Sequence, residues 1–558
     1  MTEPGLGGSG IGMTSDRGEA MPGIIPSTPR SRLSRTDPFD AVAVLLIAGL
    51  FATALLTFRD YAISNDEEVQ HRYGELILSY YASGFEDRGV FAYKNLYLYG
   101  GLFDVVAILI GRAAPADIYV IRHLLCIMIG IGGIGATWAT ARLVAGSRAG
   151  MLATLALAVC GPWFGGMFNH TKDIPFAAAM MGATYFLLRA SRDLPHPRLR
   201  HTLGFGLMLG AALGLRALGL LLLFYTLVAI AARIPRPFAG DTAARFVAHS
   251  LIGLMPGLAL GYAIMIAAWP WSALDLFNPI RGLFAFGDFQ YPIKTLFAGH
   301  TYMMAEVPRW YVPAYLAIKL PLVMLTGAAI ALVFSTGLMR TPGHRTRETA
   351  FIAFVALFPV AAEVIAHGPA FSGMRHFIFV VPPLAVLAGI GFDTMFAWLQ
   401  ARRHVLTMAA FVAVALSFLW PASVLIRLHP YEYLFFNSLV GGLQGAARTY
   451  DTDYWVNVMH AAVVELESFL DRENSPRPTR RYFVAVCGER LPFEKEAQAR
   501  GRLRWATDDD PADFFIAPTH QSCDTAIDGN VIVTVERMGV PIGVIKDRRH
   551  LTQPNLAR

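Results

Sequence analysis

The sequence predicts a polytopic α-helical membrane protein of about eleven transmembrane helices, followed by a small C-terminal α/β domain. Apolar residues make up 54% of the 558 positions and charged residues only 16%, whereas soluble domains carry about a quarter of charged residues. Apolar runs recur at lengths near the roughly 20 residues that cross a bilayer. Past residue 428 the pattern changes to short apolar strands between helical stretches.

The N-terminal segment 1–38 is rich in Gly, Pro, Ser and Thr and ends in basic residues. It has no signal-peptide-like apolar core before residue 41. We therefore expect a disordered cytoplasmic tail, followed by a membrane domain over 39–428.

Each apolar run defines one predicted span. The run 202–232 is short for two spans, but basic segments flank both ends, which favours a tight hairpin that turns near Arg216. The predicted spans lie near 40–58, 118–141, 149–166, 174–190, 202–216, 217–232, 249–269, 311–336, 349–366, 376–399 and 404–427.

The basic residues between spans predict which side of the membrane each loop occupies. Arg and Lys in short loops favour the cytoplasm, and all the basic clusters fall on one side if the N-terminus is inside. The net charge of +6 therefore reports topology, and no nucleic-acid partner is expected. The predicted outer segments are 59–117, 165–173, 270–310, 367–375 and the extracytoplasmic α/β domain 429–558.

Two features qualify this plan. The apolar stretch 96–111 carries Asp104 and is short, so we expect an interfacial or re-entrant helix rather than another span. In the C-terminal domain, Cys487 and Cys523 are the cysteines that can pair, although the sequence leaves the disulfide open. Strands are predicted within 481–488, 512–518 and 531–539, and a helix within 456–470.

Several separated motifs resemble one family. They are NDEE (65–68) after the first span, NHTKDIPFAA (169–178), VPRWYVPAYLAIKLP (307–321) and GMRHFIFVVPPLAVLAG (373–389). Over roughly residues 40–460 the chain resembles the GT-C superfamily of integral-membrane glycosyltransferases, in particular the bacterial relatives of protein O-mannosyltransferases and of lipid A aminoarabinose transferases.

The resemblance implies a glycosyltransferase of the bacterial inner membrane. It would move a sugar from a polyprenyl-phosphate-linked donor to an acceptor hydroxyl on the outer face, among membrane lipids. The acceptor stays open between a protein, a glycolipid and a polysaccharide. The alternatives are a transporter or flippase for a lipid-linked sugar, which usually places paired charges at mid-membrane, and a non-catalytic envelope-assembly subunit.

The acidic stretch is the predicted source of the catalytic base. Transfer to a hydroxyl needs a carboxylate at headgroup height to take the acceptor proton. Asp66 meets this need, as the family's acidic residue does at this place, and Glu67 is the second candidate. The alternative is that NDEE merely begins a solvated loop.

Cationic side chains are the predicted ligands of the donor phosphate. Lys172, Arg216 and Arg375 are the candidates, because phosphate needs cationic donors and charge inside an apolar hairpin suggests function. Simpler interpretations are an interfacial Lys172 paired with Asp173 and an interfacial anchor at Arg375. Asn169, His170 and Asp173 are expected to line the site.

No metal site is assigned. The oligosaccharyltransferase branch of the superfamily carries an Asp-x-Asp metal site in the second outer loop, where this chain has a single aspartate in HTKD, so a divalent metal is not supported there. Asp451 and Asp453 form an Asp-x-Asp beyond the last span. A loop or helix cap is the favoured interpretation, with an acceptor-binding role left open.

Overall fold

The computed structural model describes Met1 and residues 37–235, 240–285, 292–335, 345–473, 481–498, 501–507 and 511–552. The predicted cytoplasmic tail lies almost entirely outside the described residues. Residues Pro38–Arg558 form one compact unit.

Every predicted span coincides with a helix or a pair of helices. Among the described residues, six helices are long and apolar enough to cross a membrane, or up to eight if each bent pair is one span. This identifies a multi-pass membrane protein, while the predicted count of about eleven spans is not confirmed. The helices are α1 (Pro38–Thr57), α4 (Ile118–Ala145), α5 (Ser147–Ala158), α6 (Gly161–Asn169), α7 (Asp173–Arg192), α8 (Leu199–Leu213), α9 (Leu221–Ala231), α10 (Gly240–Ala268), α13 (Tyr311–Lys319), α14 (Leu322–Ser335), α15 (Arg345–Ala366), α16 (Val381–Gln400) and α17 (His404–Leu428).

The helices are interrupted at Arg216, near a predicted turn, and are bent at two places that were not predicted. The chain leaves α8 at Leu213 and resumes in the 3₁₀ turn η4 (Ala217–Leu220), so the helix is broken at Arg216, while the predicted hairpin of two spans stays a prediction. Helix α6 continues to Asn169, so the expected loop 165–173 shrinks to three residues before α7. The pairs α5–α6 and α13–α14 bend by 67° and 114°.

The segment between α1 and α4 holds two helices. Helix α2 (Asn65–Ala82) begins with a capping box, in which the Glu67 carboxylate accepts from the backbone N–H of Ser64 at 2.8 Å. Helix α3 (Leu102–Ala113) has 12 residues, which at about 1.5 Å per residue is too short to span. The stretch 96–111 therefore contributes no spanning helix, as expected.

Between α10 and α13 the chain forms α11 (Pro270–Leu274), α12 (Asn278–Ala285) and a hairpin of β1 (Lys294–Phe297) and β2 (His300–Met303). The hairpin is tied to the chain beyond α17, because the Asp451 carboxylate accepts from the Thr295 hydroxyl at 2.6 Å. Asp451 is thus a structural acceptor between the hairpin and the segment that follows α17.

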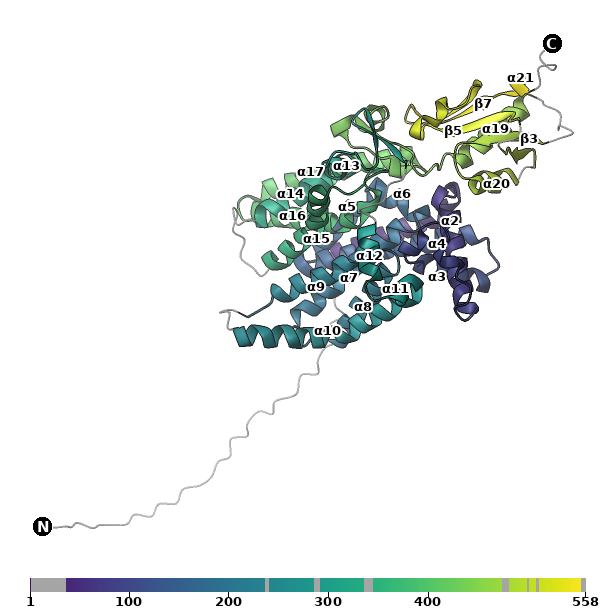
Figure 1. Cartoon of the computed structure of the whole chain (residues 1–558). Helices are drawn as coiled ribbons and strands as arrows, with labels where there is room; N and C mark the ends of the chain where they lie inside the picture. The colour runs from purple at the N-terminus through teal and green to yellow at the C-terminus, as the bar shows by residue number, and fades with distance from the viewer. Residues whose placement is uncertain are drawn as a thin grey trace, which may run out of the picture. The chain divides into compact units, whose positions relative to one another are not determined.

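The C-terminal part folds as the predicted α/β unit (Figure 1). Its sheet has the order β4-β3-β5-β7-β6, parallel across β4, β3 and β5 and antiparallel across β5, β7 and β6. Cys487 and Cys523 form a disulfide. The elements are α19 (Met459–Arg472), β3 (Tyr482–Val486), α20 (Arg490–Gln498), β4 (Leu503–Trp505), β5 (Phe514–Pro518), β6 (Asn530–Arg537), β7 (Val540–Asp547) and α21 (Arg549–Thr552).

Two of these strands were not predicted. Strand β4 has only three residues, and β7 contains Pro541 and Gly543, which normally indicate a turn. Both strands form because sheet neighbours supply their hydrogen bonds, a contribution that a local pattern does not contain.

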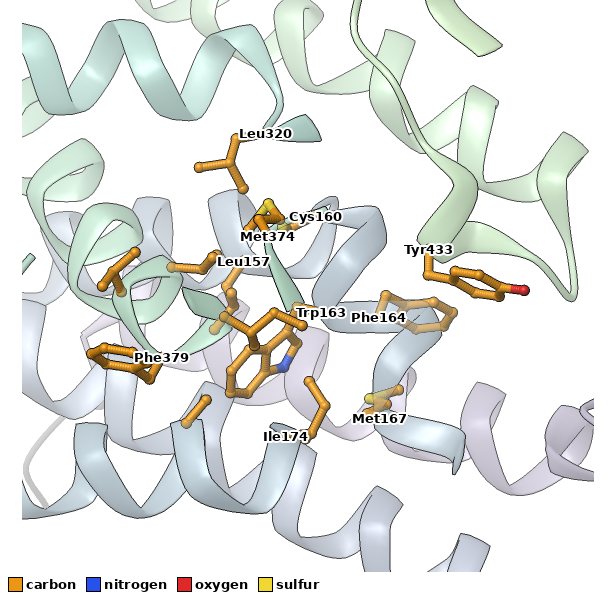
Figure 2. Packing of buried hydrophobic residues seen from close by; sticks show 14 of the residues in the cluster. Leu157, Cys160, Trp163, Phe164, Met167, Ile174, Leu320, Met374, Phe379 and Tyr433 are labelled. Atoms are coloured by element: carbon orange, nitrogen blue, oxygen red, sulfur yellow. The ribbon is translucent and has the colours of Figure 1, made fainter. Parts of the chain in front are cut away.

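A buried cluster around Trp163 joins several of the helices. Figure 2 shows Trp163 of α6 gathered with Ile174, Met374 and Phe379, and all four side chains are buried. Ile174 directly follows Asp173, and Met374 directly precedes Arg375. Close packing at this cluster therefore fixes the positions of two charged residues that the sequence singled out.

Candidate functional site

Four charged side chains form one ion-pair cluster. Arg375 Nη2 lies 2.9 Å from Asp66 Oδ2, and Arg375 Nε lies 3.8 Å from Asp173 Oδ2. Arg216 is ion-paired with the other oxygen of Asp173. The structure thus brings together the predicted base, two predicted phosphate ligands and a predicted lining residue.

Separate elements position these groups. Asp66 lies in the first turn of α2 and Asp173 is the first residue of α7. Arg216 occupies the break between α8 and η4, and Arg375 begins the 3₁₀ turn η5 (Arg375–Val380) that leads into α16. A cluster assembled from four distant segments cannot arise from one local loop, and it needs the whole helical framework.

Lys172 lies beside this cluster without an ion pair to any described carboxylate. Its ammonium nitrogen is 3.5 Å from the ring centroid of Tyr99, a cation–π contact. Burial, followed by the charge of Arg216, lowers the pKa of Lys172 to about 8. The alternative of a Lys172–Asp173 pair is not what the structure shows, since Asp173 pairs with the two arginines.

Exposure separates the three carboxylates. The Asp66 side chain is 40% exposed, whereas that of Asp173 is 1% exposed and that of Glu67 is fully buried. Of these three, Asp66 is the carboxylate that an acceptor in solution can reach.

Glu67 belongs to a second ionic network, which is formed by buried side chains. Its Oε2 lies 3.2 Å from His123 Nε2, and its Oε1 lies 3.7 Å from Arg122 Nε. Arg122 in turn donates to Asp104 at 2.8 Å and to the Thr171 hydroxyl at 3.1 Å. These side chains are buried, so Glu67 holds the start of α2 in place.

Sequence reasoning did not select Arg122 and His123 for this network. A signal existed, because an Arg-His pair at the start of an apolar span is costly without partners. From the sequence, Asp104 provides only an argument against a membrane span. In the structure its carboxylate forms an ion pair with Arg122.

Asn169 and His170, two of the predicted lining residues, lie near the ion-pair cluster. Asn169 Nδ2 donates to the carbonyl of Ala62 at 2.8 Å and to Asn457 Oδ1 at 3.1 Å. The His170 ring centroid is 4.5 Å from that of Trp455. Burial, with the nearby charge of Arg375, holds the pKa of His170 well below its usual range, so the imidazole is neutral.

Asp453 holds the loop that leads into α19 and is not its helix cap, because the N-cap residue is Val458. Its carboxylate accepts from the backbone N–H groups of Asn457 and Val458 at 3.2 and 3.3 Å, and from the Tyr433 hydroxyl. Together these bonds fix the segment just before α19.

A metal does not fit the donor set. Among the described residues no group of three or more His, Cys, Asp or Glu side chains is arranged to hold an ion. Asp66 and Asp173, the acidic residues at the cluster, are engaged by Arg375 and Arg216. No step below is therefore assigned to a metal.

Comparison with known proteins gives one family match. Residues 116–259 match the family described as dolichyl-phosphate-mannose-protein mannosyltransferase. This range contains Lys172, Asp173 and Arg216 but neither Asp66 nor Arg375. A search of curated protein sequences gave no match.

Solved structures show weaker similarity. ArnT from Cupriavidus metallidurans bound to undecaprenyl phosphate is 15% identical, with a TM-score of 0.45, over 91% of this chain and 98% of that one. The oligosaccharyltransferase AglB from Archaeoglobus fulgidus, in complex with an inhibitory peptide and a dolichol-phosphate, is 12% identical with a TM-score of 0.47, over 86% and 69%. The arabinofuranosyltransferase AftD from Mycobacteria is 13% identical with a TM-score of 0.42, over 90% and 39%.

Because these identities and TM-scores are low, the assignment depends on the family match. That match confirms, over residues 116–259, the predicted resemblance to the GT-C superfamily of integral-membrane glycosyltransferases.

Proposed function

We propose that the protein is a glycosyltransferase that moves a sugar from a polyprenyl-phosphate-linked donor to an acceptor hydroxyl. The observation that carries this proposal is the half-exposed Asp66, held 2.9 Å from Arg375 within a cluster of cationic side chains. The acceptor is a protein, a glycolipid or a polysaccharide with a free hydroxyl.

The charge of the cluster suits a lipid phosphate. Lys172, Arg216 and Arg375 are cationic, and Asp66 and Asp173 are anionic, so the five side chains carry one net positive charge when Lys172 is protonated. A polyprenyl phosphodiester carries one negative charge. Because Arg375 and Arg216 present planar sets of N–H donors, they can contact phosphate oxygens directly.

The same geometry links donor binding to the base. In the structure Arg375 Nη2 donates a hydrogen bond to one oxygen of Asp66, Oδ2. A phosphate that engages Arg375 competes with this carboxylate and leaves Asp66 available for the acceptor. The donor would then prepare the site before the acceptor is activated.

The transfer step can be written with these groups. Asp66 accepts the proton of the acceptor hydroxyl, and the oxygen forms a bond to the anomeric carbon. The bond from that carbon to the phosphate oxygen breaks, and the polyprenyl phosphate leaves with the electron pair. Arg375, Arg216 and Lys172 stabilise the charge that develops on the phosphate.

The proposal includes the topology that places this cluster at one membrane surface. Helices α7, α8 and η4–α9 would complete eleven crossings with the N-terminus in the cytoplasm of a bacterial cell. Residues 39–428 would form the membrane domain and residues 429–558 an extracytoplasmic domain. Asp66, Lys172 and Arg375 would then face outward at headgroup height.

A direct test uses the purified full chain in lipid nanodiscs with a polyprenyl-phosphate hexose labelled in the sugar, together with a bacterial envelope extract. The proposal predicts labelled acceptor and free polyprenyl phosphate. In proteoliposomes, a transporter would move the label across the membrane with the sugar–phosphate bond intact. A non-catalytic subunit would leave the labelled lipid unchanged, and either result would contradict the proposal.

A further inference from the structure

Next to the ion-pair cluster lies a group of buried, uncharged polar side chains whose hydrogen bonds are incomplete. Asn169, His170 and Asn457 are all buried. Within the described part of the chain, Asn169 Oδ1, Asn457 Nδ2 and both ring nitrogens of His170 have no hydrogen-bond partner. Unpaired buried polar atoms are uncommon and costly, so this concentration calls for a ligand.

Short contacts hold these groups together. Asn169 and Asn457 are hydrogen-bonded at 3.1 Å, and the His170 ring lies tilted against Trp455 with centroids 4.5 Å apart. Trp455 also contacts the guanidinium of Arg375, whose central carbon is 4.3 Å from the ring centroid. The uncharged group therefore directly adjoins the proposed phosphate site.

The segment that carries Trp455 and Asn457 is held in an unusual conformation. Val456, between them, has φ 57°, a left-handed value that a β-branched residue rarely adopts. Asp453 bonds to the backbone N–H groups of Asn457 and Val458 and keeps the segment in place. Such conformations persist where surrounding contacts enforce them, and they are concentrated at binding sites.

The chemistry of the unpaired atoms indicates the ligand class. An amide oxygen, an amide NH₂ and a neutral imidazole together offer both acceptors and donors but no net charge. A phosphate accepts hydrogen bonds only, so it would leave the Asn169 oxygen unpaired. Sugar hydroxyl groups both donate and accept, and the apolar face of a sugar ring packs on an aromatic side chain.

We propose that Asn169, His170, Trp455 and Asn457 form the subsite for the sugar of the lipid-linked donor. This inference rests on the proposed function, because the sugar is bonded directly to the phosphate that Arg375 would hold. The sugar hydroxyl groups supply the missing hydrogen-bond partners. The subsite therefore distinguishes a sugar-bearing lipid from a bare polyprenyl phosphate.

The test compares the affinity of the full chain in nanodiscs for two probes, a polyprenyl-phosphate hexose and the bare polyprenyl phosphate. His170→Phe keeps the aromatic ring and removes its nitrogens, and Asn457→Leu keeps the approximate size of the side chain. A neutral hydrogen bond contributes about 0.5–1.5 kcal/mol. Wild type is expected to prefer the hexose lipid, and each variant should lose about 2- to 10-fold of that preference while its affinity for bare polyprenyl phosphate stays unchanged.

His460→Phe is the matched control, because His460 lies in the following helix α19 and faces Glu496 instead. It should keep the full preference. Equal affinity of wild type for the two lipids, or variants that weaken both lipids equally, would overturn the sugar subsite. A lower melting temperature with the preference intact would also overturn it, by assigning these residues a purely structural role. Failure of wild type to bind either lipid would instead contradict the proposed function.

Discussion

Two ionic clusters contact the first turn of α2, and adjacent residues of the NDEE stretch belong to different ones. Asp66 enters the cluster with Arg375, Asp173 and Arg216, and its side chain is 40% exposed. Glu67 enters the network with Arg122 and His123, where all three side chains are nearly or fully buried.

The difference shows how one acidic stretch serves two purposes. Glu67 is fully buried beside Arg122 and His123, and its Oε2 accepts from the backbone N–H of Ser64, so its loss is expected to affect folding. The two arginines and two aspartates of the Asp66 cluster balance each other, and Lys172 beside them adds one positive charge when it is protonated. With this charge and the partly exposed Asp66 carboxylate, the cluster has capacity for a ligand.

The largest expected effect is on turnover in Asp66→Asn. The substitution keeps the shape of the side chain and removes its basicity, so transfer should fall by about 10²–10⁴-fold. The rate of polyprenyl phosphate release from the hexose lipid, measured with envelope extract, tests this. Glu68→Gln is the control, because Glu68 lies on another face of α2 beside Glu489, and it should retain most activity. Wild-type turnover by Asp66→Asn would place the base elsewhere.

The next effect should appear in stability rather than chemistry. Arg122→Gln leaves Asp104 and Glu67 without their cationic partner in a buried network. Removing one partner of a buried ion pair costs about 3–5 kcal/mol, so the melting temperature in detergent should fall markedly. Asp66→Asn, compared in the same thermal unfolding experiment, should unfold close to wild type. Similar melting temperatures for Arg122→Gln and wild type would remove the distinction between the two clusters.

A smaller effect is expected on lipid affinity. Arg375→Gln removes charged hydrogen bonds to the phosphate, each worth about 1.5–3 kcal/mol, so polyprenyl phosphate should bind about 10- to 100-fold more weakly. Direct binding measurements in nanodiscs provide the test. Arg490→Gln, an exposed arginine paired with Glu494 in the C-terminal part, serves as control and should bind normally. An unchanged affinity in Arg375→Gln would favour the interfacial-anchor interpretation.

The smallest effect concerns pH. The pKa of Lys172 is lowered to about 8 in the unliganded protein. A bound anion favours the ammonium form, so the affinity for the hexose lipid should fall as pH rises above 8, by at most tenfold per pH unit. The phosphodiester itself keeps its charge over this range. Lys172→Met should bind more weakly and independently of pH between about 7 and 9. If the affinity of Lys172→Met fell with pH as steeply as that of wild type, the titrating group would be another residue.

The fold was largely predictable because its signals are local. Twenty-residue apolar runs, the break at Arg216 and the changed pattern past residue 428 each appear in the structure as expected. The bends within α5–α6 and α13–α14 were not predicted. They depend on packing between helices, as where Gly165 of α6 meets the backbone of Tyr433 at a distance that a side chain would block.

The candidate site was predictable in its residue types but not in its pairings. The sequence singles out charged residues near apolar runs, because placing charge there costs free energy and usually indicates function. These residues are Asp66, Lys172, Asp173, Arg216 and Arg375. That Arg375 is shared between Asp66 and Asp173, and that Glu67 turns toward Arg122, depends on segments up to 309 positions apart. Trp455 and Asn457 were missed for the same reason, because nothing in their local pattern points to His170.

If a lipid phosphate and Asp66 compete for Arg375, the affinity of Asp66→Asn for polyprenyl phosphate reports this competition most directly. Removing the carboxylate frees Arg375 and eliminates a repulsive charge, so this variant should bind the lipid more tightly than wild type. Because Asp66 is partly exposed, the gain should be modest, about 1 kcal/mol or fivefold. Tighter binding together with lost turnover is the predicted result. Weaker binding by Asp66→Asn would contradict the account, since it would show that Asp66 supports the phosphate site instead of competing for it.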